Sequence, residues 1–317
     1  LPVNFFVVIR EIPVIIEIVK KKLTKMHALG IFFALGAGLF FGILAPTTKF
    51  AYNLGVGVSL AILMRYLVAS LIISPLIPFQ KNLLNVYKKN IFDFLKITFG
   101  SILLTGGLLV SVKYIEVSLT ILIFCTYPIF VLCFSIIFDK EKISSIVKIL
   151  FFTTFIGLFF VLGPSFNSLN IIGVLCATIA SAGATTMIIV NQKMSNKLIS
   201  PLQINIFINI FNAIFFFIVL FFFFSINFSI SKISFFVLLI PSCSYAIALL
   251  LQLLAIPKIG QSNTALFLYL EPVIAIIGAV ILLKETLNNY QLFGAIIVLL
   301  SLGLASYLTK KTKNDFA

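Results

Sequence analysis

Apolar residues occur in long runs along almost the whole chain, and short polar or Pro/Gly-containing segments separate the runs. Each run has about 18–23 residues, enough for an α-helix to cross about 30 Å of hydrocarbon. A transmembrane β-barrel would instead show alternating segments of about ten residues. The pattern predicts ten membrane-spanning helices, near residues 28–47, 57–79, 95–112, 117–138, 146–163, 170–190, 202–224, 233–254, 262–283 and 289–308.

The composition supports an all-α integral membrane protein. Of the 317 residues, 61% are hydrophobic and 10% are charged, and the mean hydropathy is +1.21. A soluble domain is roughly 45–50% apolar and about a quarter charged, so a globule of this composition would leave too much apolar surface in water. The chain is therefore predicted to be neither a cytosolic enzyme nor a disordered protein.

The net charge of +14 predicts a topology rather than a nucleic-acid partner. If the N-terminus is cytoplasmic, most of the 23 basic residues fall in cytoplasmic loops. Four lie in the opposite loops, namely Lys49, Lys113, Lys232 and Lys284, and Arg65 lies within a span. Because cytoplasmic loops of membrane proteins are enriched in Lys and Arg, both termini are predicted to be cytoplasmic.

The two ends of the chain differ from the spans. Residues 1–26 form an N-terminal extension that Arg10, Glu11 and Glu17 make too polar for a good span. We expect either that Met26 is the natural start or that this extension is a dispensable interfacial helix. It has no basic segment before its apolar part, so we do not expect a signal peptide. Residues 310–317 are predicted to be a basic cytoplasmic tail.

The chain contains an internal repeat. An offset of 144 residues aligns Pro128 with Pro272, Glu141 with Glu285, Ser118 with Ser262, Thr120 with Thr264, Ile115 with Ile259 and Lys49 with Lys193. The repeats, residues 27–163 and 164–309, hold five spans each. Because five is odd, the second repeat is predicted to be inserted upside down relative to the first. Inverted repeats are typical of secondary transporters, whose site lies near the membrane midplane between the halves.

The same offset relates two stripes of small residues. Both have a spacing of four, which places each stripe on one face of its helix and predicts close helix packing. The first stripe is Ala34, Gly38 and Gly42, and the second is Thr178, Ala182 and Thr186.

Two segments carry a resemblance to a known family. Lys113–Ile143 and Ala255–Leu287 each have a small-residue helix entry, a mid-helix proline and an acidic residue 13 positions after it. They resemble the signature of EamA-type members of the drug/metabolite transporter superfamily. The resemblance covers nearly everything from His27 to Lys310 and implies a transporter with a 5+5 arrangement of spans. The first repeat has Asp139-Lys140-Glu141 where Gly-Glu-Arg is commoner in that family, so no subfamily is assigned.

Arg65 is the first candidate for a substrate-binding residue. It lies about 9 residues into the second span, where an ionised Arg costs at least ~2.5–3.5 kcal/mol unless it faces a cavity or a partner. The alternative is an Arg that extends to the headgroups, which is strained from this depth. The resemblance also supports a binding role, because the family often has an Arg in its second span.

Glu271 is the candidate for a coupling group or counter-charge. It lies as deep as Arg65, directly before Pro272. A buried carboxylate must pair or bind a proton, so Glu271 is predicted to pair with Arg65 or to bind the coupling proton, and a purely structural pairing is the alternative. Pro272 and Pro128 are predicted to kink their helices and to free the carbonyls of Leu268 and Phe124. Freed carbonyls are satisfied by neighbours, water or ligand.

Amide and phenol groups provide further candidates for substrate binding. Asn205, Asn209 and Asn212 share one face of the seventh span, and the repeat offset makes Asn209 the counterpart of Arg65. They are predicted either to bind a polar solute or to join helices by hydrogen bonds. Tyr127 and Tyr269, beside the two prolines, and Gln252 are candidate solute contacts. Tyr66 and Tyr245 are further candidate lining groups.

The sequence favours a secondary carrier of a small polar organic metabolite, with protons as a possible coupling ion. Export of amino acids or related compounds across the bacterial cytoplasmic membrane is what the resemblance implies. An importer or exchanger of a nucleoside-like or S-adenosylmethionine-like host metabolite is the alternative, and a channel or scaffold is a distant one. The single His27 and four scattered cysteines predict no metal site, cofactor or enzyme activity, and a monomer is compatible with the chain.

Overall fold

The computed structural model describes residues 5–80, 82–115, 117–140, 143–162, 170–223, 231–284 and 289–315. These residues form helices joined by short connections, and the described chain contains no strand. The helices are α1 (Phe5–Asn53), α2 (Val58–Ile73), the 3-10 helix η1 (Ser74–Phe79), α3 (Leu83–Lys89), α4 (Ile91–Tyr114), α5 (Val117–Phe124), α6 (Tyr127–Ile137), α7 (Ser145–Leu162), α8 (Ile171–Asn196), α9 (Pro201–Phe223), α10 (Lys232–Ile259), α11 (Gln261–Phe267), α12 (Leu270–Leu283) and α13 (Asn289–Asp315).

The all-α membrane fold predicted from the sequence is confirmed. Within the described residues, seven helical segments are long and apolar enough to cross a membrane, and three shorter apolar helices accompany them. Each predicted span coincides with one helix or with a consecutive pair of helices. The exact number of crossings and the cytoplasmic side of the termini stay predictions.

Two of the predicted spans are each interrupted by a two-residue turn. α5 and α6 are separated at Cys125 and Thr126, and α11 and α12 are separated at Leu268 and Tyr269. Each break comes just before a proline, which has no N–H to continue the helical hydrogen bonds. The Leu268 carbonyl, to which Pro272 cannot donate, instead accepts the Glu271 N–H at 3.0 Å in a tighter turn, so a neighbouring group satisfies it.

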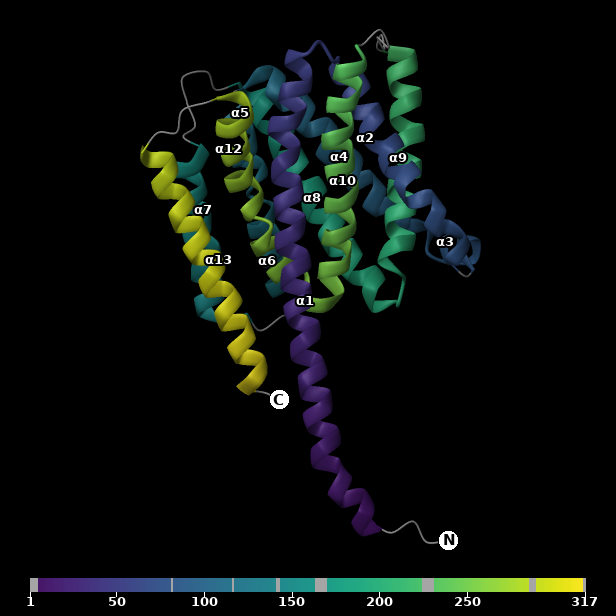
Figure 1. Cartoon of the computed structure of the whole chain (residues 1–317), viewed down its shortest axis with the longest axis vertical. Coiled ribbons are helices and arrows are strands. Elements are labelled where there is room, and N and C mark those ends of the chain that lie inside the picture. Colours follow the sequence, from purple (N-terminus) through teal and green to yellow (C-terminus); the bar gives the residue numbers. More distant parts are fainter. Residues whose placement is uncertain are drawn as a thin grey trace.

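Two helical features differ from the predicted spans. α3 is a short helix between the second and third spans that the hydrophobic pattern did not indicate. α1 has 49 residues and runs without interruption from the N-terminal extension into the first span. Its N-terminal part projects from the bundle at the end where the C-terminus also lies (Figure 1). The repeat boundaries and the dispensability of the extension stay predictions.

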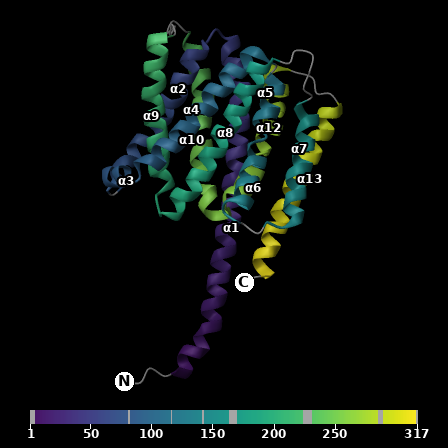
Figure 2. The same ribbon diagram turned by 180° about the vertical axis from the view of Figure 1, so that it is seen from behind.

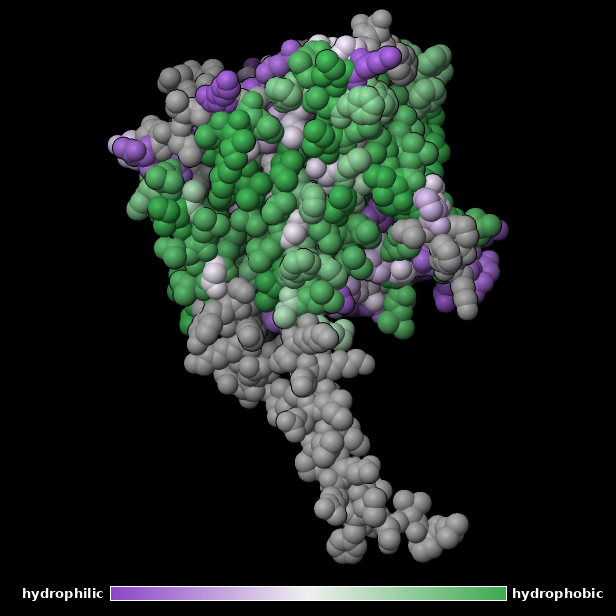
Figure 3. Space-filling model, viewed as in Figure 1, coloured by the Kyte–Doolittle hydropathy of each residue, from purple (hydrophilic) through white to green (hydrophobic). Residues whose placement is uncertain are grey.

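The packing of the bundle reflects the internal repeat. α1 runs along α10, and α8 runs along α4 in the equivalent way under the offset of 144 residues. α7 and α13, the last span of each repeat, pack against each other at one side of the bundle (Figure 2). The side of the bundle seen in Figure 3 is apolar along most of its height, with polar residues at its upper edge and near α3. Exposed side chains such as Leu71 and Phe222 therefore suit a lipid environment.

The small-residue stripe of α1 allows a close approach to the broken span of the second repeat. Ala34, Gly38 and Gly42 are all buried. A Cβ on Gly42 would lie 2.5 Å from the Glu271 carbonyl oxygen, and one on Gly38 would lie 3.1 Å from Leu270 Cβ. The backbone that carries Glu271 thus lies directly against Gly42, where an added Cβ would clash.

The corresponding stripe of α8 does not form the equivalent contact. Thr178 and Ala182 are exposed and Thr186 is half-buried. α8 instead contacts the broken span of the first repeat through Ser181, whose hydroxyl is 3.0 Å from that of Thr126, and through Thr185, which donates to the Tyr127 carbonyl at 3.4 Å. The contact face of α8 is displaced by one residue from the predicted stripe, because the residues on both sides of Ala182 are also small and allow either face to pack.

Gly42→Ala tests the close contact between α1 and α12. The added methyl group must displace the Glu271 backbone, so we expect a loss of about 1–3 kcal/mol of stability, as for other overpacked cores. Thermal unfolding in detergent measures this effect. Gly303→Ala is the control, since a Cβ there meets no atom within 4 Å. Equal unfolding temperatures for the two variants would contradict the contact.

Candidate functional site

A cavity of about 110 Å³ lies at the breaks of the two interrupted spans. Side chains from both repeats line it, and most of them are apolar. They are Phe41, Leu44, Arg65, Ser101, Leu104, Thr105, Leu108, Phe124, Tyr127, Ala184, Met187, Tyr245, Leu249, Gln252, Leu268 and Glu271. The size and the few polar groups suit a small solute rather than a macromolecular segment.

The cavity lies where the two repeats are related to each other. Ten of its residues form five pairs under the offset of 144 residues, namely Ser101 with Tyr245, Thr105 with Leu249, Leu108 with Gln252, Phe124 with Leu268, and Tyr127 with Glu271. Residues related by an inverted repeat share one cavity only if it lies on the pseudo-two-fold axis. The chemistry within the pairs differs, so the two walls of the cavity are not equivalent to a bound solute.

Arg65 reaches the cavity from the middle of α2. Its side chain is half-buried, and its guanidinium carbon lies 5.5 Å from the centre of the Tyr245 ring. Such a cation–π contact contributes about 2 kcal/mol when water is excluded. In the described part of the chain, no carboxylate forms an ion pair with Arg65. The guanidinium N–H groups are therefore accessible to a group in the cavity.

Glu271 enters the cavity in the first turn of α12, immediately after the break. It is half-buried, and its backbone packs against Gly42. The predicted pairing of Glu271 with Arg65 is not present as a direct ion pair among the described residues. Two side chains of opposite charge type, one from each repeat, thus line one small cavity without a direct ion pair between them.

The three asparagines of α9 lie behind the cavity and not on its surface. All three are fully buried. The Asn209 amide donates to the Asn205 carbonyl oxygen at 2.9 Å and also contacts the Asn205 side chain. The Asn212 amide donates to the Ser101 hydroxyl at 2.7 Å, and Ser101 lines the cavity. The asparagine face therefore reaches the site through Ser101, and its predicted role in solute binding is untested.

The predicted tyrosine and glutamine contacts divide into two groups. Tyr127, Tyr245 and Gln252 line the cavity. Tyr269 is 1% exposed and its ring contacts Phe151 edge-on, while Tyr66 is fully buried behind Tyr245. The sequence interpretation missed Ser101, Thr105 and Phe124, although the repeat offset relates each of them to another lining residue.

Each interrupted span consists of two half-helices, α5 and α6 in the first repeat and α11 and α12 in the second. The half-helices of the two repeats pack against each other to different extents. α6 packs on α11, but α5 and α12, which lie toward the end of the bundle away from the termini, make far fewer contacts with each other (Figure 1). The Gln261 amide of α11 donates to Ser135 Oγ at 2.7 Å and to Asp139 Oδ2 at 2.6 Å, and Ser262 donates to Ser135 at 2.9 Å. Polar contacts between the repeats thus hold these half-helices together at the end near the termini.

Gln261→Leu tests these contacts between the half-helices. The substitution removes one bond to a carboxylate and one to a hydroxyl, so we expect a loss of about 1–3 kcal/mol of stability. Asn263→Leu is the matched control, because the Asn263 amide donates within its own helix, to the Ile259 carbonyl. The two variants are compared by thermal unfolding in detergent. A smaller loss for Gln261→Leu than for Asn263→Leu would contradict a joining role.

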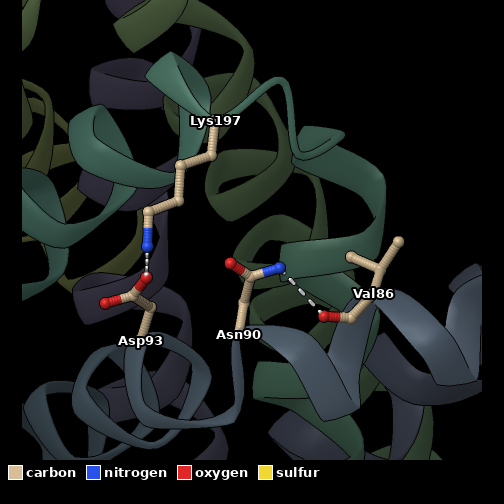
Figure 4. A network of polar contacts seen from close by, with 4 residues as sticks. All are labelled: Val86, Asn90, Asp93 and Lys197. Atoms are coloured by element: carbon tan, nitrogen blue, oxygen red, sulfur yellow. Dashed lines mark hydrogen bonds and ion pairs between the residues drawn. The ribbon is translucent and has the colours of Figure 1, made fainter.

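A second polar network joins the repeats on the surface beside α3. Lys197, at the end of α8, contacts Asp93 of α4 at 2.5 Å, and Asn90 donates to the Val86 carbonyl at 3.1 Å (Figure 4). The Tyr87 hydroxyl donates to the Gln203 carbonyl at 3.0 Å. Burial raises the pKa of Tyr87, so this hydroxyl keeps its proton as a donor. The network fixes α3 to α9 and contributes no group to the cavity.

Comparison with known proteins identifies the repeat. The model of the EamA-like transporter family matches residues 28–163 and again residues 171–307. None of the curated proteins compared with this chain matches it. One crystal structure of a protein superposes with a TM-score of 0.77 at 11% sequence identity, over 90% of this chain and 99% of that chain. At this identity the superposition shows a shared fold alone.

Proposed function

Because this chain belongs to the EamA-like transporter family, we propose that it is a secondary active transporter of a small zwitterionic organic solute. Amino acids and related metabolites are the solutes of this kind that we favour. The single observation that carries the proposal is that Arg65 and Glu271 face one cavity without a direct ion pair between them.

The proposed binding mode uses both charges. The solute carboxylate accepts from the Arg65 guanidinium, whose fork of N–H donors matches two carboxylate oxygens. The solute ammonium lies at Glu271. Gln252, Ser101 and Thr105 add neutral donors and acceptors, and Phe41 and Phe124 provide an apolar wall for the rest of the solute. A solute with one charge would leave the other protein charge unpaired in a low-dielectric site, which disfavours its binding.

Coupling follows if a proton and the solute compete for Glu271. A protonated carboxyl cannot hold the ammonium, so binding of one releases the other. This competition exchanges solute for protons, and an inward proton gradient then drives export, which is the direction we propose across the bacterial cytoplasmic membrane. Import with the opposite exchange uses the same residues.

Alternating access follows from the unequal half-helices. The contacts of Gln261 with Ser135 and Asp139 close one end of the pathway. In an inverted repeat the opposite state separates α6 from α11 and brings α5 against α12, so the solute site opens to the other side. Since the closing contacts lie at the end near the termini, the described state is proposed to face outward.

Counterflow in liposomes tests the proposed function. Purified protein is reconstituted into liposomes loaded with each of the twenty common L-amino acids, and entry of the same labelled amino acid is followed. We expect saturable, accelerated exchange for a subset of them. The corresponding amines, which have no carboxylate, should be poor substrates. Non-saturable flux would indicate a channel, and equal exchange of amines and amino acids would contradict the two-charge site.

A further inference from the structure

Arg65 has an aromatic neighbour, Tyr245, to which the proposed binding mode assigns no contact with the solute. Tyr245 lies beneath the guanidinium, with 5.5 Å from Arg65 Cζ to the ring centre. Among the described residues Arg65 forms no ion pair, and its guanidinium contacts this ring. We propose that Tyr245 is the positioning residue of an anion subsite that takes the solute carboxylate at Arg65. The proposal rests on the proposed function.

Other aromatic rings hold the Tyr245 ring in place. Tyr66 contacts it edge-on, with 5.4 Å between ring centres and an interplanar angle of 81°. Tyr66 is itself stacked on Phe216 at 5.3 Å and 7°. Phe41 contacts Tyr245 at 6.4 Å and 58°. The four rings come from α1, α2, α9 and α10, so the position of Tyr245 depends on both repeats.

A hydrogen bond fixes the second ring of this group. The Tyr66 hydroxyl lies 2.6 Å from the Thr105 hydroxyl of α4. Both side chains are buried, which strengthens the bond. Tyr66 and Arg65 are consecutive residues, and this bond therefore also fixes the turn of α2 from which Arg65 extends.

The chemistry of a cation–π contact explains why this arrangement suits a carboxylate. The ring face attracts the positive charge without accepting the guanidinium N–H groups in ordinary hydrogen bonds. All five donors thus stay available in their planar fork, which is complementary to a carboxylate. A protein carboxylate in the same place would hold Arg65 equally well but would occupy the donors that the solute needs.

Nuclear magnetic resonance tests the geometry without knowledge of the solute. The chain has only two arginines, Arg10 and Arg65, so ¹⁵N-arginine labelling gives two Nε–H signals in detergent, and Arg65→Lys assigns them. Because a proton above an aromatic face is shielded, we expect an upfield Arg65 signal in the unaltered protein. The signal should stay upfield in Tyr245→Phe and move to the Arg10 position in Tyr245→Leu. An Arg65 signal without an upfield shift in the unaltered protein overturns the proposal, whether or not any variant folds.

Transport kinetics test the role in binding. For the amino acid with the fastest counterflow, Tyr245→Leu should raise KM about ten- to thirtyfold, the factor that a desolvated cation–π contact corresponds to, and should reduce the preference for that amino acid over its amine. Tyr245→Phe should recover most of the KM. Phe236→Leu, an exposed aromatic on the same helix, is the matched control. An unchanged KM and preference in Tyr245→Leu would overturn the positioning role. If no amino acid is exchanged, the proposed function fails, and the signal of Arg65 still decides the placement of Tyr245.

Discussion

Arg65→Ala is expected to reduce counterflow about hundredfold, to near the level of protein-free liposomes. The variant loses two charge-assisted hydrogen bonds to the solute carboxylate, each worth about 1.5–3 kcal/mol, and a tenfold change corresponds to about 1.4 kcal/mol. Insertion should be unaffected, because removal of a charge from the middle of a span favours the membrane. Initial rates of labelled amino-acid entry, divided by the amount of reconstituted protein, provide the measurement.

Two further variants make this result specific. Arg65→Lys keeps the positive charge but loses the planar fork, so its rate should lie between those of Arg65→Ala and the unaltered protein. Lys96→Ala removes an exposed basic residue of α4 and should leave the rate unchanged. Transport by Arg65→Ala at the rate of Lys96→Ala would remove Arg65 from the site.

Glu271→Gln is expected to abolish the response of transport to an imposed pH gradient. The amide keeps the shape of the side chain but carries neither the proton nor the negative charge, so solute and proton no longer exchange at this position. We also expect the remaining flux to be about tenfold lower, because the solute ammonium loses a charged partner worth at least about 1.4 kcal/mol. The measurement compares rates with and without a pH difference of two units across the liposome membrane.

The pH response separates the two roles predicted for Glu271. If the carboxylate serves only as the counter-charge of the ammonium, flux falls in Glu271→Gln while the remaining rate still follows the pH gradient. That outcome would reject the competition mechanism and retain the two-charge site. Asp93→Asn is the control, since this carboxylate pairs with Lys197 beside α3 and contributes nothing to the cavity.

Much of the fold was predictable because the membrane imposes simple rules on the sequence. The apolar runs marked the helices, since the backbone polar groups of a lipid-exposed segment must be satisfied within the segment. The offset of 144 residues indicated the two repeats, and the family matches at 28–163 and 171–307 confirm them. Pro128 and Pro272 located the interruptions of two spans. The form of each interruption, a two-residue turn between two shorter helices, was visible only in the structure.

Of the candidate site, the sequence predicted most clearly the residues whose placement within the membrane costs the most free energy. Arg65 and Glu271 were conspicuous because a charge within a span is disfavoured without a special environment. Neutral lining residues such as Ser101, Thr105 and Phe124 carry no such signal, because the same residue types are common in ordinary helix packing. Asn209 illustrates the converse, since it matches Arg65 under the repeat offset yet lies in the layer behind the cavity.

The sequence by itself determined the membrane location, the helical spans, the duplication and the two charges that require explanation. These features follow from local composition and periodicity, because a segment within the bilayer must be apolar and must satisfy its backbone hydrogen bonds internally. The tertiary structure decided that Arg65 and Glu271 face one cavity, that Tyr245 lies beneath the guanidinium and that α6 packs on α11 more closely than α5 packs on α12. Those outcomes depend on the rotation of each helix about its axis. Periodicity alone does not determine this rotation to within one residue, as the displaced contact face of α8 shows. The packing between the helices determines it.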